Sequence, residues 1–226
     1  MDRFAPSHLI ALAVTAAAAV ALGWWARRHR PDDRRLRYAC RALAVAMVVA
    51  EVGLRVAVYV EDGVRPGANL PLHLTHFAWL ACVIALWTAA PLAFELAYFW
   101  GAAAVTQALV TPSLNHDFPD VRYWEFMAVH APVIVGITLM AWGCRMTPRR
   151  GAVIRAWLAS WVAFAVAATA TVLTNGNYMF ARNPPPKGSL LDLMGPHPYY
   201  LAGAALLALT AFTLLNLPFH ARRTEA

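Results

Sequence analysis

Leu70-Pro71-Leu72-His73-Leu74-Thr75-His76 begins the third of seven apolar segments, and the alternation of such segments with polar loops decides the fold. Two imidazoles and a hydroxyl lie within this stretch, at the start of an apolar segment where polar groups are costly and usually functional. We therefore expect any chemistry of this protein to be located here.

The composition is that of a polytopic membrane protein. Of the 226 residues, 60% are hydrophobic and 14% are charged, and the apolar residues form blocks long enough to cross a bilayer core of about 30 Å. The net charge of +7 does not indicate nucleic-acid binding, because the basic residues gather in alternate loops as membrane topology requires. Membrane lipids are the expected partners, and we expect no nucleic-acid partner.

The apolar segments predict an all-α fold, a single seven-helix transmembrane bundle that occupies residues 1–226. The first segment has its arginines after the apolar run, which is the reverse of a cleaved signal peptide. A long outer loop, 175–197, exceeds the length of a simple connection and is typical of a functional segment. The expected helices span residues 8–26, 38–60, 71–88, 91–110, 122–144, 152–174 and 198–219.

Lysine and arginine are divided unequally between the two sets of loops. Because cytoplasmic loops carry the excess of these residues, the richer set predicts an outside N-terminus and a cytoplasmic C-terminus. The protein is then a multi-pass protein of the cell membrane, expected to be a bacterial plasma membrane. The richer set holds Arg27, Arg28, Arg30, Arg34, Arg35, Arg37, Arg41, Arg145, Arg149, Arg150, Arg155, Arg222 and Arg223, and the poorer set holds Arg3, Arg65, Arg122, Arg182 and Lys187.

Polar groups concentrate in the outer half of the predicted bundle, while the inner half offers little beyond Glu95 and Ser160. This asymmetry favours a polar cavity that opens to the outer face. Structural roles stay open for several of these groups, since Glu51 and Arg55 can pair within one helix and buried amides can join helices. The outer groups are Arg55, His73, Thr75, His76, Gln107, Glu125, His130, Asn175, Asn177 and His197.

Two chemistries could use the outer histidines. In one, an imidazole acts as general base for the hydroxyl of Thr75. In the other, His73, His76 and His130 hold zinc together with Glu125 or Asp192, leaving one position open for water.

Helix geometry separates the two chemistries in part. On an ideal helix His73 and His76 are about 60° apart, whereas Thr75 is about 200° from His73 and about 100° from His76. The base for Thr75 is therefore expected from another helix, which favours His130, unless the turn after Pro71 is unwound.

Several ordered motifs resemble those of the YwaF-like bacterial integral membrane proteins, whose animal relative is the transmembrane protein 164 family. The resemblance covers roughly residues 70 to 200 and implies a seven-helix all-α fold. The motifs are Leu70-Pro71-Leu72-His73-Leu74, Phe94-Glu95-Leu96-Ala97-Tyr98-Phe99-Trp100-Gly101, Gln107-Ala108-Leu109, Thr111-Pro112, His130, Asn177-Tyr178-Met179, Ser189-Leu190-Leu191-Asp192 and Gly195-Pro196.

The animal relative resembles a phospholipid acyltransferase with a Cys thioester and a His partner, and a more distant resemblance is to androgen-induced membrane hydrolases that use Thr and His. The resemblance places the nucleophile at Thr75 and the histidine at His130. Thr75 stands where the close relatives usually carry Cys, and His197 stands where an aromatic residue is expected.

The leading interpretation is an enzyme that transfers or hydrolyses lipid acyl esters in an outer-leaflet cavity. Thr75 would be the nucleophile, His130 its base, and His73 or His76 the group that stabilises the oxyanion. No cofactor and no metal belong to this interpretation. The alternatives are a zinc-dependent membrane hydrolase, and a non-catalytic transporter, receptor or lipid-binding protein. The expected substrate-binding residues are Arg55, Gln107, Glu125, Asn177, Tyr178 and Asp192.

Overall fold

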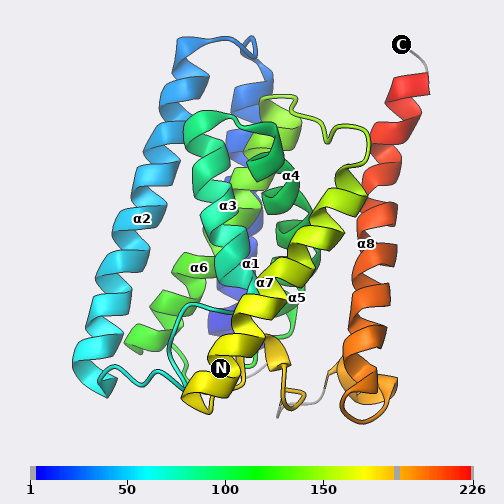
Figure 1. The fold of residues 1–226 in the computed structure, drawn as a ribbon. Coiled ribbons are helices and arrows are strands. Elements are labelled where there is room, and N and C mark those ends of the chain that lie inside the picture. Colours follow the sequence, from blue (N-terminus) through cyan, green and yellow to red (C-terminus); the bar gives the residue numbers. More distant parts are fainter. Residues whose placement is uncertain (1–3, 186–188, 225–226) are drawn as a thin grey trace.

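The computed structural model describes residues 4–185 and 189–224, and these residues form an all-helical bundle without strands (Figure 1). Arg3 and Lys187 of the charge comparison lie outside the described residues. The elements are α1 (Pro6–Arg27), α2 (Arg34–Asp62), α3 (Leu74–Thr88), α4 (Pro91–Trp100), the π-helix η1 (Gly101–Val105), α5 (Thr106–Val110), α6 (Val121–Thr138), the π-helix η2 (Leu139–Gly143), α7 (Ala152–Thr174), the 3₁₀ helices η3 (Tyr178–Phe180) and η4 (Leu190–Met194), and α8 (Tyr199–Thr224).

Seven helical segments cross the bundle, because α4, η1 and α5 run on without interruption and η2 continues α6. Among the described residues, six of these segments are long and apolar enough to span a membrane. The seventh, α3, has 15 residues and is therefore about 22 Å long at 1.5 Å per residue. The seven-helix bundle is confirmed, and its third segment is shorter than the others.

The predicted boundaries agree with the helices most closely where a proline begins the segment, as at 91–110, or a glycine precedes it, as at 152–174. Helix α2 starts earlier than residue 38 because the side chain of Asp33 accepts a hydrogen bond from the backbone N–H of Arg35 at 2.7 Å and caps the helix. Helix α3 starts at Leu74 and not at residue 71. His73 is extended, with φ −82° and ψ 155°, so the turn after Pro71 is unwound.

Helices α3 and α6 form the middle of the bundle, and α8 lies at its edge against α7 and η4 (Figure 1). α3 contacts α2, α4 and α6, while α6 also contacts α1. Small residues allow the closest approaches. A Cβ at Gly143 would lie 2.5 Å from the Cβ of Ala26, and one at Gly136 would lie 2.6 Å from Sγ of Cys82.

The start of α1 and the end of α8 lie at opposite ends of the bundle (Figure 1), as seven crossings require. Following the predicted orientation, we call the end with residues 63–73, 111–120, 175–185 and 189–198 the outer end, and the end with residues 28–33 and 144–151 the inner end. The orientation itself stays a prediction.

One carboxylate organises the inner end. Glu95 of α4 has no exposed surface and accepts hydrogen bonds from the backbone N–H of Arg149 at 2.9 Å and from the guanidinium groups of Arg149 and Arg155 at 2.8 to 3.1 Å. Hydrogen bonding to this carboxylate raises the pKa of Arg149. Glu95 therefore joins the 144–151 loop and α7 to α4, and both of its carboxylate oxygens accept hydrogen bonds.

Candidate functional site

The densest polar cluster surrounds Arg55, near the outer end of α2. Its guanidinium donates to Oε1 of Glu51 at 2.9 and 2.5 Å, to Nε2 of His76 at 2.9 Å and to the carbonyl of Asn69 at 3.2 Å. It also forms an ion pair with Glu125 of α6. We call Glu51, Arg55, His76 and Glu125 the outer cluster. It joins α2, α3 and α6. The side chains of its ion pairs, those of Glu51, Arg55 and Glu125, are only 9 to 18% exposed.

Charge and proton positions follow from these contacts. Two carboxylates share one guanidinium, so the outer cluster carries a formal excess of one negative charge when both carboxylates are ionised and His76 is neutral. Because Nε2 of His76 accepts from Arg55, the proton of the neutral imidazole is on Nδ1. The guanidinium therefore fixes the tautomer of His76.

Three buried polar atoms in or beside the outer cluster have no hydrogen-bond partner among the described residues. They are Oε2 of Glu51, Nδ1 of His76 and Nε1 of Trp79. Trp79 follows His76 by three residues, so both side chains lie on neighbouring positions of one face of α3. Buried polar atoms are nearly always paired, and two unpaired N–H donors one turn apart are suited to bind an oxygen.

The outer cluster also brings together three groups with metal-ligand chemistry. The ligand atoms of Glu51, His76 and Glu125 lie within 4.8 Å of one another. This set differs from the expected one, which combined three histidines with Glu125 or Asp192. The guanidinium of Arg55 contacts all three groups, so a divalent cation would have to displace it. The donor set therefore fits a buried cationic side chain better than zinc.

His130 of α6 is buried, at 6% exposure. Its Nδ1 lies 2.7 Å from the carbonyl of Phe126, and its ring stacks on that of Phe126 with centroids 4.1 Å apart. A carbonyl can only accept, so Nδ1 of His130 carries the proton and Nε2 is left unprotonated. Nε2 is the atom that a general base requires.

Thr75 lies in the first turn of α3 and is half-buried. It precedes Cys82 by seven residues, which places the two on the same helix face to within about 20°. Sγ of Cys82 lies against Gly136 of α6, and α3 and α6 both run from the outer to the inner end. Counting back seven residues on each helix predicts that Thr75 lies at the level of Val129, one residue before His130. The hydroxyl of Thr75 forms no hydrogen bond with the described residues.

His73 connects the outer cluster with the 175–185 segment. Its Nδ1 accepts a hydrogen bond from the backbone N–H of Met179 at 3.4 Å. Its ring centroid lies 5.7 Å from those of Tyr178 and Phe180 and 6.3 Å from that of His76. His73 is extended and outside the helix, so the angle of about 60° expected between His73 and His76 on an ideal helix does not apply, although the two rings are close. With this turn unwound, helix geometry no longer requires the base for Thr75 to come from another helix.

Tyr178 is buried and holds two outer segments together. Its hydroxyl donates to the carbonyl of Pro66 and accepts from the backbone N–H of Leu70 at 3.2 Å. The residue was expected to bind substrate. Its contacts fix the unwound chain that leads into α3, and so they position His73.

Three further expected substrate-binding residues lie apart from the outer cluster. Gln107 is exposed. Asn177 closes its own loop, accepting from the backbone of Arg182 and Asn183 at 3.0 and 3.1 Å and donating back to Asn183 at 2.8 Å. Asp192 accepts from the backbone N–H of Ser189 in a capping box at the start of η4. The side chains of Asn177 and Asp192 are therefore engaged in hydrogen bonds within their own loop and turn.

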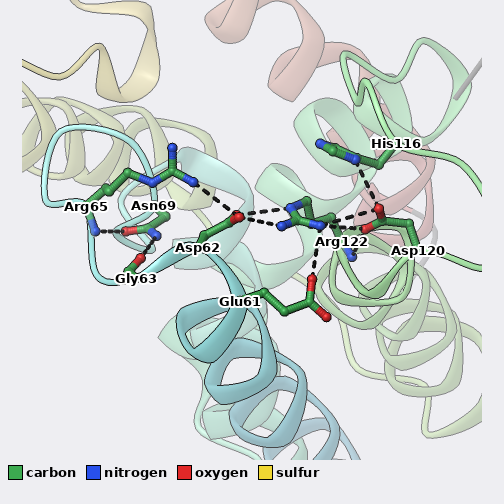
Figure 2. Close-up of polar contacts among 8 residues, drawn as sticks. All are labelled: Glu61, Asp62, Gly63, Arg65, Asn69, His116, Asp120 and Arg122. Carbon is green, nitrogen blue, oxygen red and sulfur yellow. Dashed lines mark hydrogen bonds and ion pairs between the residues drawn. The ribbon is translucent and has the colours of Figure 1, made fainter.

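A second ionic group joins the end of α2 to the start of α6 (Figure 2). Arg122 forms ion pairs with Asp62 and Asp120, and with Glu61 at 3.2 Å. The hydrogen bond from the backbone N–H of Arg122 lowers the pKa of Asp120, which caps α6. Figure 2 also shows Asp62 contacting Arg65 of the loop that follows. This rim closes the outer end of the α2–α6 contact.

The expected opening to the outer face is not evident around Arg55, where the paired side chains are largely buried. Two depressions of the described surface lie at the inner end instead, beside Tyr38, Arg41 and Trp87. The polar outer half is present as predicted, but in this conformation it is packed closed. Side chains would have to move for an acyl ester to enter.

Sequence reasoning missed Trp79 and gave Glu51 only a pairing role. The distance of Glu51 from Arg55, four residues, predicted the pair correctly, but nothing in that spacing places Glu125 and His76 on the same guanidinium. For Trp79 a signal was present, since an indole three residues after His76 shares its helix face.

Comparison with known proteins gives one family. The model of the TMEM164 family matches residues 3–216. No curated protein and no solved structure matches the chain.

Proposed function

Because the chain belongs to the TMEM164 family, we propose that it is an integral membrane enzyme that transfers or hydrolyses lipid acyl esters. The observation that carries the proposal is the state of His130, whose Nδ1 is held by the carbonyl of Phe126. Its Nε2 is then free to act as a base at the level of the unpaired hydroxyl of Thr75.

In the first half-reaction, Nε2 of His130 takes the proton of the Thr75 hydroxyl as Oγ1 attacks the carbonyl carbon of a glycerophospholipid ester. The bond from this carbon to the glycerol oxygen then breaks. The departing oxygen takes the proton back from the imidazolium and leaves as the hydroxyl of a lysophospholipid. The acyl chain remains on Thr75 as an ester.

In the second half-reaction, an acceptor hydroxyl loses its proton to the same nitrogen and attacks the acyl-threonine. When the acceptor is a lysophospholipid, the result is acyl transfer, and when it is water, the result is a fatty acid. Thr75 regains its proton from His130 in either case. The closed, buried surroundings of the outer cluster favour transfer, because they keep water away from the acyl-threonine.

Both half-reactions pass through an oxyanion, and α3 supplies groups that can stabilise it. The Nδ1–H of His76 and the Nε1–H of Trp79 are buried without partners. Preorganised hydrogen-bond donors in a low-dielectric site stabilise the negative charge that develops in a transition state effectively. Of the two expected oxyanion residues, His76 has the suitable free donor, whereas Nδ1 of His73 is used by Met179.

Arg55 has a positioning role in this proposal. By donating to Nε2 of His76 it keeps the proton on Nδ1, the nitrogen that has no partner. Glu51 and Glu125 hold the guanidinium in place.

Transport is the less favoured alternative, because the polar groups of the inner half are paired with each other. Glu95 is bound by Arg149 and Arg155, and Nε1 of Trp100 donates to Ser160 at 2.8 Å. These contacts leave few free groups for a polar pathway to the inner face. A lipid-binding protein without catalysis remains an outcome of the test below.

The test uses purified protein in phosphatidylcholine vesicles with an isotope-labelled acyl chain, and it follows labelled lysophospholipid, fatty acid and transferred product. Thr75→Ala and His130→Gln are each expected to lower turnover by about 10² to 10⁴-fold. The matched controls are Thr169→Val, which removes an exposed hydroxyl bonded only to Ala165, and His29→Gln, which removes a partly exposed imidazole bonded to a carbonyl four residues earlier.

Full turnover in the controls with loss in both site variants supports the proposal. Unchanged turnover in both site variants, or absence of any turnover in the unaltered protein, overturns it. Loss of a stoichiometric metal on His76→Asn would instead support the zinc hydrolase.

A further inference from the structure

The first turns of α2 and the last turn of α3 form a shallow groove on the surface of the bundle, at its inner end. Its volume is about 690 Å³, and it is lined by apolar side chains together with Arg41: Tyr38, Arg41, Ala42, Val45, Ala46, Val49 and Trp87. A smaller depression of about 170 Å³ adjoins it and is lined by Arg34, Arg37, Tyr38 and Arg41. The two share Tyr38 and Arg41, so a basic pocket continues directly into an apolar groove.

The arginines of this pocket have no acidic partner among the described residues. The side chains of Arg34 and Arg37 form no hydrogen bond or ion pair there, and the guanidinium of Arg41 lies 5.3 Å from the ring of Trp87. The nearest acid in sequence, Asp33, is used to cap α2 through the backbone N–H of Arg35. Three guanidinium groups within two helical turns therefore remain uncompensated.

The dimensions of the groove agree with one leaflet of a membrane. From Tyr38 to Val49 is a rise of about 16 Å along α2, close to half of the roughly 30 Å hydrocarbon core. Tyr38 and Trp87 are 63% and 50% exposed, and aromatic residues of this kind settle at the boundary between headgroups and hydrocarbon. An acyl chain in the groove would thus have its headgroup level with Arg34, Arg37 and Arg41.

We propose that this groove is a binding site for an anionic phospholipid of the inner-end leaflet, with the phosphate held by Arg34, Arg37 and Arg41 and one acyl chain lying along Ala42, Ala46 and Val49 beside Trp87. Charge complementarity selects the anionic headgroup, because guanidinium groups bind phosphate oxygens in pairs of hydrogen bonds. A zwitterionic lipid brings its own cation and gains less from this pocket. The site is separate from the outer cluster and does not depend on the activity proposed there.

The test measures quenching of Trp87 by lipids with brominated acyl chains. The protein is reconstituted in phosphatidylcholine vesicles that contain an equal fraction of either brominated phosphatidylglycerol or brominated phosphatidylcholine. The chain has nine tryptophans, so the signal of Trp87 is taken as the difference between the unaltered protein and Trp87→Phe. Brominated phosphatidylglycerol is expected to quench Trp87 at a lower mole fraction than brominated phosphatidylcholine.

The triple variant Arg34→Gln, Arg37→Gln, Arg41→Gln is expected to reduce this preference by about tenfold or more, since each basic group near the membrane surface contributes to anionic-lipid binding. The control carries the same change of charge at the same end of the bundle, through Arg28→Gln, Arg30→Gln and Arg35→Gln, and is expected to keep the preference.

A groove-filling variant, Ala42→Leu with Ala46→Leu, leaves the charges intact on two exposed positions and is expected to lower quenching by both lipids. Equal quenching by the two lipids in the unaltered protein overturns the proposal. A preference that falls equally in both triple variants also overturns it, since general surface charge would then be sufficient.

Discussion

Arg55 on α2 donates a hydrogen bond from Nη2 to Nε2 of His76 on α3 at 2.9 Å. This contact joins two helices and determines which nitrogen of the imidazole holds the proton. The same guanidinium pairs with Glu51 and Glu125, so its removal would leave two carboxylates without a partner in a nearly closed site.

We expect Arg55→Gln to destabilise the fold by about 3 to 5 kcal/mol, the usual loss when one partner of a buried ion pair is removed. The comparison is Arg65→Gln, since Arg65 is 60% exposed and pairs with Asp62 on the surface, where such pairs contribute about 0 to 1 kcal/mol. Thermal unfolding in detergent measures both. Similar losses in the two variants would show that the outer cluster is not a buried ionic network.

Trp79→Phe tests the oxyanion role because it removes one N–H and keeps an aromatic ring. Losing one such donor typically lowers turnover by about 10² to 10³-fold. Trp157→Phe is the control, as its Nε1 donates to the carbonyl of Ala205 at 2.9 Å, far along the chain in α8. Turnover of labelled lipid in vesicles gives the comparison. If Trp79→Phe is as active as the control, the N–H of Trp79 does not stabilise the oxyanion.

Glu95→Gln is expected to destabilise the fold by about 1 to 3 kcal/mol, because the guanidinium groups that lose their anion are 50% and 37% exposed and are partly hydrated. The carboxylate has no exposed surface, and its loss leaves the guanidinium groups of Arg149 and Arg155 without their anion. Glu61→Gln is the control because its side chain is 53% exposed. A midpoint of thermal unfolding that shifts equally in both variants would contradict the role assigned to Glu95.

Two of the three cysteines are close enough to report on the packing of α2 against the end of α6. Sγ of Cys40 lies 3.8 Å from Sγ of Cys144. Diamide, which accepts two electrons and two protons, is expected to convert the two thiols to one disulfide. Peptide mass spectrometry should find this bond while Cys82, which has no exposed surface, stays reduced. A free Cys40 and Cys144 after oxidation would contradict this packing.

The sequence predicts the helices well because each apolar segment is long and the breaks between them are chemically clear. The start of α3 is the main exception. A helix with Pro71 in its first turn is allowed, and only the contacts of the outer loops, such as those of Tyr178 with Pro66 and Leu70, show that the chain is extended as far as His73.

The sequence predicts how deep in the membrane each residue of the site lies, but it does not predict how each helix is rotated about its axis. Position along each helix correctly placed Arg55, His76 and Glu125 in one layer, and it also placed Gln107 there. Whether a side chain turns inward depends on how each helix is rotated against its neighbours, and periodicity is uninformative in segments that are apolar on all sides. For this reason Gln107 is exposed while Trp79 is an unexpected neighbour of the outer cluster.

The central claim is that Thr75 carries the acyl chain between two half-reactions. The most direct measurement is peptide mass spectrometry of the protein after brief incubation with vesicles of acyl-labelled phospholipid. The account predicts the mass of one acyl chain on the peptide that contains Thr75, absent in Thr75→Ala and in His130→Gln and retained in Thr169→Val. Labelled product that forms at the full rate in Thr75→Ala, with no acylated peptide in the unaltered protein, would contradict it.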